Sequence, residues 1–186
     1  MSNPCTDVLT DKEYLSHMIP HHMVAIDMSN LLIPVSKNPS IHNLCRNIIR
    51  NQKFEIWEMN KYLNGMSDNL YQDDYKGVYN HKISKLELHE PIMSKSKDGD
   101  CNPMFFKPND HKKHMEHMEI NDTSYLTHMI PHHQIAIDMS KRLLLYTNHS
   151  YLLEFCKNLI IEQEGEIYLM NNMLKNRFNV YSELLN

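Results

Sequence analysis

The chain has 186 residues, of which 41% are hydrophobic, so it can form a substantial core as one ordinary domain or two small ones. A formal net charge of −4 gives nucleic acid no basic surface to bind, and no apolar run approaches the roughly 20 residues of a membrane-spanning helix. The first residues show no basic and apolar secretory signal, so we expect the cytoplasm or a virion. Composition leaves the oligomeric state open.

Counts of cysteine, methionine and histidine narrow the chemistry. The four cysteines (Cys5, Cys45, Cys101 and Cys156) include no C-x-x-C pair, which disfavours a disulfide framework or a zinc ribbon. The 14 Met and 13 His are high counts, because Leu or Ile would fill a core equally well. These residues supply many soft and borderline metal ligands.

The first part of the chain predicts a helical hairpin. Thr10 and Glu13 match a capping box, so a helix begins at residue 11 and continues to about residue 32. The prolines within residues 34–39 then interrupt the chain. Apolar residues recur with a 3.6-residue period after this break, which predicts a second helix over residues 41–64.

Residues 67–120 form a polar connector that contains three prolines. Connections of this length are usually functional or have little order. We expect short helices near residues 75–89 and 110–119.

The last part of the chain repeats the first at a constant offset of 111 residues. Without gaps, 24 of the 53 positions in residues 11–63 are identical to those in residues 122–174. The densest match, His-Met-Ile-Pro-His-His, occupies residues 17–22 and 128–133. We infer a tandem duplication with helices over residues 122–146 and 150–175, the first of them starting at Asn121 or Asp122 without a capping box.

The duplication determines the predicted architecture. A hairpin of about 50 residues cannot bury its apolar stripe alone, so the two copies should pack together. The sequence therefore predicts an all-α protein, a four-helix bundle with a pseudo-twofold axis. Its hairpin repeats occupy residues 10–66 and 121–176, and the connector occupies residues 67–120.

The first helix of each copy contains a His–Met motif. Met18, His21 and His22 share one helix face, Pro20 should kink the helix beside them, and Glu55 and Met59 share a face of the second helix that can meet this one. The predicted metal ligands of the first copy are His17, Met18, His21, His22, Met28, Glu55 and Met59. Those of the second copy are His128, Met129, His132, His133, Met139, Glu166 and Met170.

A second cluster lies in the connector. His111, His114, Met115, His117 and Met118 fall within eight residues, and His111, His114, Met115 and Met118 share a helix face. Short His-rich tracts are a compositional signal for metal binding, and imidazole with thioether favours copper, Cu(I) in particular. We expect the repeat ligands to matter more, because packed helices hold them in place.

Both copies resemble the family called domain of unknown function 305. The resemblance rests on Met18-Ile19-Pro20-His21-His22-x-x-Ala25-Ile26-x-Met28 and on Ile49-x-x-Gln52-x-x-Glu55-Ile56-x-x-Met59, which recur at residues 129–139 and 160–170. It implies a ferritin-like helical fold, and the best-understood members are secreted bacterial proteins that bind copper and protect against it. The family's ligands correspond to His17, Met18, His21, His22, Met28 and Met59 and to the residues 111 positions later.

The sequence thus predicts a protein that binds copper ions, Cu(I) or Cu(II), for buffering or tolerance rather than for catalysis. Two alternatives stay open: a metal-free structural or interaction bundle, such as a virion or scaffold component, and an uncharacterised metal oxidase. Copper binding is expected to weaken as the pH falls through about 6.5, where imidazole gains a proton. Cys45 and Cys156 are expected to pack in the core, with extra Cu(I) ligation as the alternative.

Overall fold

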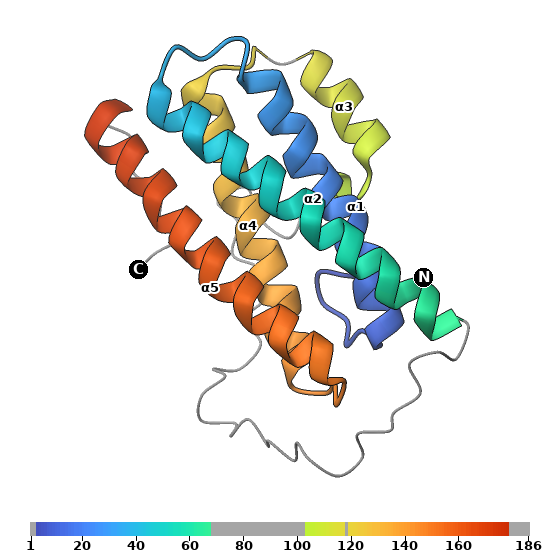
Figure 1. Ribbon diagram of the computed structural model, residues 1–186. Helices are drawn as coiled ribbons and strands as arrows, with labels where there is room; N and C mark the ends of the chain where they lie inside the picture. Colours follow the sequence, from blue (N-terminus) through green and yellow to red (C-terminus); the bar gives the residue numbers. More distant parts are fainter. Residues whose placement is uncertain (1–2, 68–102, 118, 179–186) are drawn as a thin grey trace.

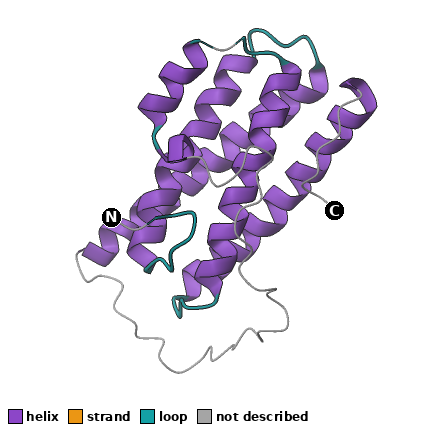
Figure 2. Cartoon of the chain, turned by 180° about the vertical axis from the view of Figure 1, so that it is seen from behind, coloured by secondary structure: helices purple, strands orange, loops and turns teal. Residues whose placement is uncertain are grey.

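The computed structural model describes residues 3–67, 103–117 and 119–178 (Figure 1). All regular structure in these ranges is helical (Figure 2), which confirms the predicted all-α class. The elements are α1 (Asp11–Leu32), α2 (Pro39–Ser67), η1 (Pro103–Phe106), α3 (Pro108–Glu116), α4 (Asp122–Leu144), α5 (Ser150–Met173) and η2 (Leu174–Phe178). Within the described ranges, no helix is long and apolar enough to span a membrane.

Side-chain caps set where α1 and α4 begin. The hydroxyl of Thr10 accepts a hydrogen bond from the backbone of Glu13, whose carboxylate accepts one from the Thr10 N–H, as predicted. Asn121 caps α4 in the same way with Ser124, so the prediction that this start lacks a capping box was wrong. A serine hydroxyl is long enough to reach the Asn121 N–H at 2.9 Å, although the motif normally uses Glu or Gln.

Proline has a different role in each helix of the first hairpin. The sequence placed Pro39 in the break before the second helix, but it is the first residue of α2. The first turn accommodates proline, because the N–H that proline lacks would have no helical partner there. Pro20 lies inside α1, which continues through it over 22 residues.

The long helices form two hairpins, and the hairpins meet through α1 and α4 (Figure 1). The hydroxyls of Tyr14 and Ser140 lie 2.7 Å apart at one end of this contact, and those of Ser29 and Tyr125 lie 2.7 Å apart at the other. Early residues of α1 therefore face late residues of α4, so the two helices run antiparallel. The connector elements η1 and α3 pack against α1.

Cys45 and Cys156 lie fully buried beside these Tyr–Ser pairs, as the sequence predicts. Burial raises the pKa of the Cys45 thiol to about 11 and that of Cys156 to about 12. Both thiols are free and stay protonated at neutral pH, which makes them poor nucleophiles. Cys5, by contrast, is disulfide-bonded.

The Tyr–Ser pairs give a test of the α1–α4 contact. Ser29 donates to the backbone oxygen of Ala25, so Tyr125 donates to Ser29, and its loss leaves a buried hydroxyl without that partner. We expect Tyr125→Phe and Tyr14→Phe each to lower the free energy of unfolding by about 1–2 kcal/mol. Urea unfolding monitored by circular dichroism measures this change. The control is Tyr146→Phe, at a residue that is 57% exposed, and an equal effect there would contradict the interpretation.

Candidate metal centre

His21 of α1 and His132 of α4 form a stacked pair in the middle of the helix contact. Their ring centroids are 3.7 Å apart with an angle of 26° between the planes, and neither residue is exposed. The Nε2 atom of each ring lies 3.1 Å from the backbone oxygen of the other residue. The two residues thus exchange a pair of hydrogen bonds between the hairpins.

This exchange determines where each ring holds its proton. A carbonyl oxygen only accepts hydrogen bonds, so Nε2 carries the hydrogen in both rings. Burial, together with the neighbouring histidines, holds the pKa of both imidazoles well below its ordinary value, so both are neutral at pH 7. Nδ1 of each ring therefore presents a bare lone pair. Both Nδ1 atoms are buried without a hydrogen-bond partner among the described residues.

His22 and His133 extend the pair on either side. Nε2 of His22 donates to the carboxylate of Glu55 at 2.7 Å, and Nε2 of His133 donates to that of Glu166 at 2.6 Å. Both imidazoles are fully buried, whereas the two glutamates are 13% and 14% exposed. The Nδ1 atoms again have no partner in the described part of the chain. Ligating histidines in proteins commonly use one nitrogen for the metal and donate from the other to a carboxylate or carbonyl.

Gln52 and Gln163 add one more unpartnered group to each hairpin. Both residues are 3% exposed, and the Oε1 atom of each has no hydrogen-bond partner within the described ranges. A buried polar group left unpaired costs about 1–3 kcal/mol, and native proteins pair nearly all such groups. Three equivalent groups are thus unpaired in both hairpins, and each has a lone pair that an electron-pair acceptor, such as a metal ion, could accept.

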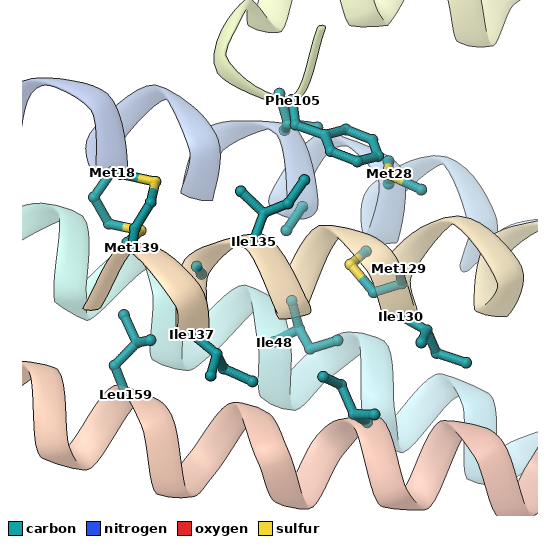
Figure 3. Packing of buried hydrophobic residues seen from close by; sticks show 14 of the residues in the cluster. Met18, Met28, Ile48, Phe105, Met129, Ile130, Ile135, Ile137, Met139 and Leu159 are labelled. Atoms are coloured by element: carbon teal, nitrogen blue, oxygen red, sulfur yellow. The ribbon is translucent and has the colours of Figure 1, made fainter. Parts of the chain in front are cut away.

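Methionine thioethers are buried in the same core. Figure 3 shows Met18 and Met139 at one end of the α1–α4 contact and Met28 and Met129 at the other. These four residues, with Met59 of α2 and Met170 of α5, are at most 1% exposed. Methionine needs no hydrogen bond when buried, so packing alone also accounts for it. Beside bare imidazole nitrogens, however, its sulfur is a soft potential ligand.

Within residues 3–67, 103–117 and 119–178, no group of three His, Cys, Asp or Glu side chains is arranged to hold a metal ion. A preformed zinc site, which needs four such ligands in a tetrahedron, is therefore not present among them. The potential metal donors in this core are therefore imidazole nitrogens and thioether sulfurs. That set favours Cu(I) over hard cations.

The connector element η1 covers the stacked pair. The ring of Phe106 lies 5.2 Å from that of His21, and the ring of Phe105 lies 5.0 Å from that of His132. His17, a predicted ligand, is partly buried with its ring 6.0 Å from Phe106. Sequence analysis did not select these phenylalanines. The sequence feature that could have identified them is the apolar run Met104-Phe105-Phe106, which lies between two prolines of the otherwise polar connector.

The predicted connector cluster is only partly brought together. The helix α3 spans Pro108–Glu116 rather than residues 110–119, with His111 and Met115 buried and His114 and His117 exposed. The ring of His114 lies 6.3 Å from that of His128 on α4, which sequence analysis assigned to the repeat motif. Met118 and the helix predicted over 75–89 lie outside the described residues.

Comparison with known proteins identifies a family that this chain matches. Residues 11–174 match the family described as Domain of unknown function (DUF305). The protein named Uncharacterized protein L153 of Acanthamoeba polyphaga mimivirus is 47% identical over 55 residues, which cover 30% of this chain. The match spans only 36% of that relative's length.

Solved structures of the protein CopM share the fold. Its Ag-bound form obtained by soaking has a TM-score of 0.65 and 24% identity, covering 92% of this chain and 99% of CopM. Its Cu(II)-bound form has a TM-score of 0.62 and 25% identity, covering 91% and 99%. These likenesses support the helical fold, and the structural neighbour binds metal ions.

Buried neutral histidines make the metal-free protein sensitive to acid. His21 and His132 have lowered pKa values in the folded chain, so below about pH 6.5 the unfolded chain binds protons that the folded chain does not. We expect the free energy of unfolding to be highest above pH 6.5 and to fall below it, by up to about 1.4 kcal/mol per pH unit for each histidine.

Urea titrations from pH 7.5 to 5.5 measure this slope. Replacing both residues, His21→Gln with His132→Gln, should flatten it. His117→Gln, at an exposed position, should leave it unchanged. A double variant as acid-sensitive as the parent chain would contradict the assignment.

Proposed function

Because this chain belongs to the DUF305 family, which covers residues 11–174, we propose that it binds copper ions and serves to buffer them or to confer tolerance. The observation that supports this most directly is the set of four imidazole Nδ1 atoms without hydrogen-bond partners in the described part of the chain, those of His21, His22, His132 and His133. They are buried and lie in a core in which six methionines are at most 1% exposed.

Each residue type contributes a distinct property. The Nδ1 atoms would be the nitrogen donors. The candidates for sulfur donors are Met18, Met28, Met129 and Met139 on the two inner helices, with Met59 and Met170 on the outer helices. Glu55 and Glu166, predicted as ligands, would instead orient His22 and His133 through the hydrogen bonds to Nε2. Because the pKa values of His21 and His132 are lowered, protons should compete with the ion for these two residues only at a pH well below 6.5. From the sequence alone, this competition is expected at about pH 6.5.

The metal-bound structures of CopM support the same choice of ion. CopM binds silver and Cu(II) in the structures compared above. Silver and Cu(I) share a preference for soft ligands, and thioethers are the softest donors in this core. A closed centre with hydrogen-bonded ligands suits retention of an ion better than turnover of a substrate.

We interpret the chain as two tandem copies of one hairpin, residues 10–66 and 121–176, in a ferritin-like four-helix bundle joined by residues 67–120. The support is that contacts recur at the 111-residue offset. His22–Glu55 corresponds to His133–Glu166, and Tyr14–Ser140 corresponds to Tyr125–Ser29. A metal-free structural bundle is the alternative, and copper titration separates the two.

Anaerobic titration with Cu(I), with a colorimetric chelator as competitor, tests the centre. We expect the double variant His21→Ala with His132→Ala to lose the buried copper, whereas His117→Ala retains it. Circular dichroism establishes that each variant is folded. Equal copper binding by the folded double variant and the parent chain would favour the structural alternative.

The glutamates give a milder test that leaves every donor in place. We expect Glu55→Gln with Glu166→Gln to weaken copper binding by about 10- to 100-fold without changing its stoichiometry, the usual effect of removing a partner of a ligating histidine. The control is Lys141→Ala, which removes an exposed ion pair with Glu164. A change of stoichiometry would instead make the glutamates direct ligands.

A further inference from the structure

A second histidine cluster lies outside the buried centre and combines two elements. His111 and His114 of α3 have ring centroids 6.4 Å apart, and His114 lies 6.3 Å from His128 of α4. We call these residues the connector triad. His114 is exposed, His128 is partly buried and His111 is 1% exposed, so the triad leads from the surface into the protein.

The Nε2 atom of His111 is the observation that suggests a ligand at this cluster. Its Nε2 is buried and has no hydrogen-bond partner among the described residues. Burial and the nearby His128 and His114 lower the pKa of His111 to about 4. The imidazole of His111 is thus neutral at pH 7. Its unpartnered Nε2 belongs to a ring that has two other imidazoles nearby, those of His114 and His128.

The triad is not preformed as a metal site, because no trio of described His, Cys, Asp or Glu side chains is arranged to hold an ion. Its spacing must therefore tighten when an ion binds. Metal–nitrogen distances of about 2.0 Å place two imidazole centroids on one ion roughly 4.5–6 Å apart. The observed separations exceed this range only slightly. His114 is exposed, so a change of its rotamer closes the gap at little cost.

The triad also adjoins the buried centre. The ring of Phe105 lies 6.1 Å from that of His111 on one side and 5.0 Å from that of His132 on the other. The order from solvent inwards is therefore His114, His111, Phe105 and His132. One aromatic side chain separates the two groups of ligands.

We propose that His111, His114 and His128 form a second, solvent-accessible copper site that acquires the ion and passes it by Phe105 to the buried centre. This inference rests on the proposed function for delivery, although the triad binds copper whether or not the centre does. It assigns His128 to the connector rather than to the repeat motif. Its equivalent in the first copy, His17, faces Phe106 instead.

A groove on the other side of the bundle is the competing route. It has a volume of about 650 Å³ between α2 and α5, and its lining includes Glu55, Glu58, Glu154 and Glu162. Carboxylates attract cations, and Glu55 contacts His22 directly. Oxygen ligands, however, suit hard ions such as magnesium and calcium, so the imidazoles of the triad are the better match for copper.

Rapid mixing of the full-length metal-free chain with Cu(I), held by a weak chelator, tests the route. We expect His114→Ala to slow loading by about tenfold or more and to remove one bound copper, because its loss leaves the triad short of a ligand. The matched control is Lys113→Ala, an exposed residue of the same helix outside the predicted ligands, which should load like the parent chain. NMR with substoichiometric Ag(I), a diamagnetic substitute, should shift the imidazole signals of His111, His114 and His128 first.

The outcomes separate this inference from the proposed function. Identical loading by His114→Ala and Lys113→Ala would overturn the triad. Slow loading by Glu58→Gln with Glu154→Gln, at an unchanged rate for His114→Ala, would also overturn it. If His21→Ala with His132→Ala keeps one rapidly bound copper that His114→Ala lacks, the triad stands independently of the buried centre. A parent chain that binds no copper overturns both.

Discussion

The reciprocal hydrogen bonds between His21 and His132 are the constraint on which the rest of the centre depends. They join the hairpins in the middle of the α1–α4 contact, where both rings are fully buried. Because each ring donates from Nε2 to a carbonyl oxygen, Nδ1 is left bare. Burial keeps the rings neutral, so the contact that joins the hairpins also leaves two nitrogen lone pairs without partners.

The connector breaks the symmetry that the two hairpins share. The glutamate partners of His22 and His133 and the Tyr–Ser pairs occur twice at the 111-residue offset. The elements η1 and α3 occur once, and they cover one side of the stacked pair with Phe105 and Phe106. A chain with two equivalent halves thus has an asymmetric environment around its centre, with additional histidines on one side only.

The softness of the donors and their enclosure support the proposal that the protein retains copper rather than catalyses a reaction with it. The core offers neutral imidazoles and thioethers, and within the described ranges it offers no converging trio of His, Cys, Asp or Glu. Thioethers do not titrate, and burial lowers the pKa of His21 and His132, so these donors stay available as the pH falls. The buried thiols are unreactive for the same reason of burial, which raises their pKa values.

The sequence by itself determined the long helices, their order and the faces that bear His, Met and Glu, because these follow from periodicity, capping and the residues repeated at the 111-residue offset. It also placed Glu55 on the face that meets His22. It was wrong in expecting no capping box at the start of α4 and about the role of Pro39. It did not select Phe105 or Phe106, since their partners are distant in the chain. Only the tertiary structure decided that His21 stacks on His132, that Glu55 accepts from Nε2, and that His128 lies beside His114. These contacts join residues 111, 33 and 14 positions apart, and no local pattern specifies which nitrogen of a ring points where.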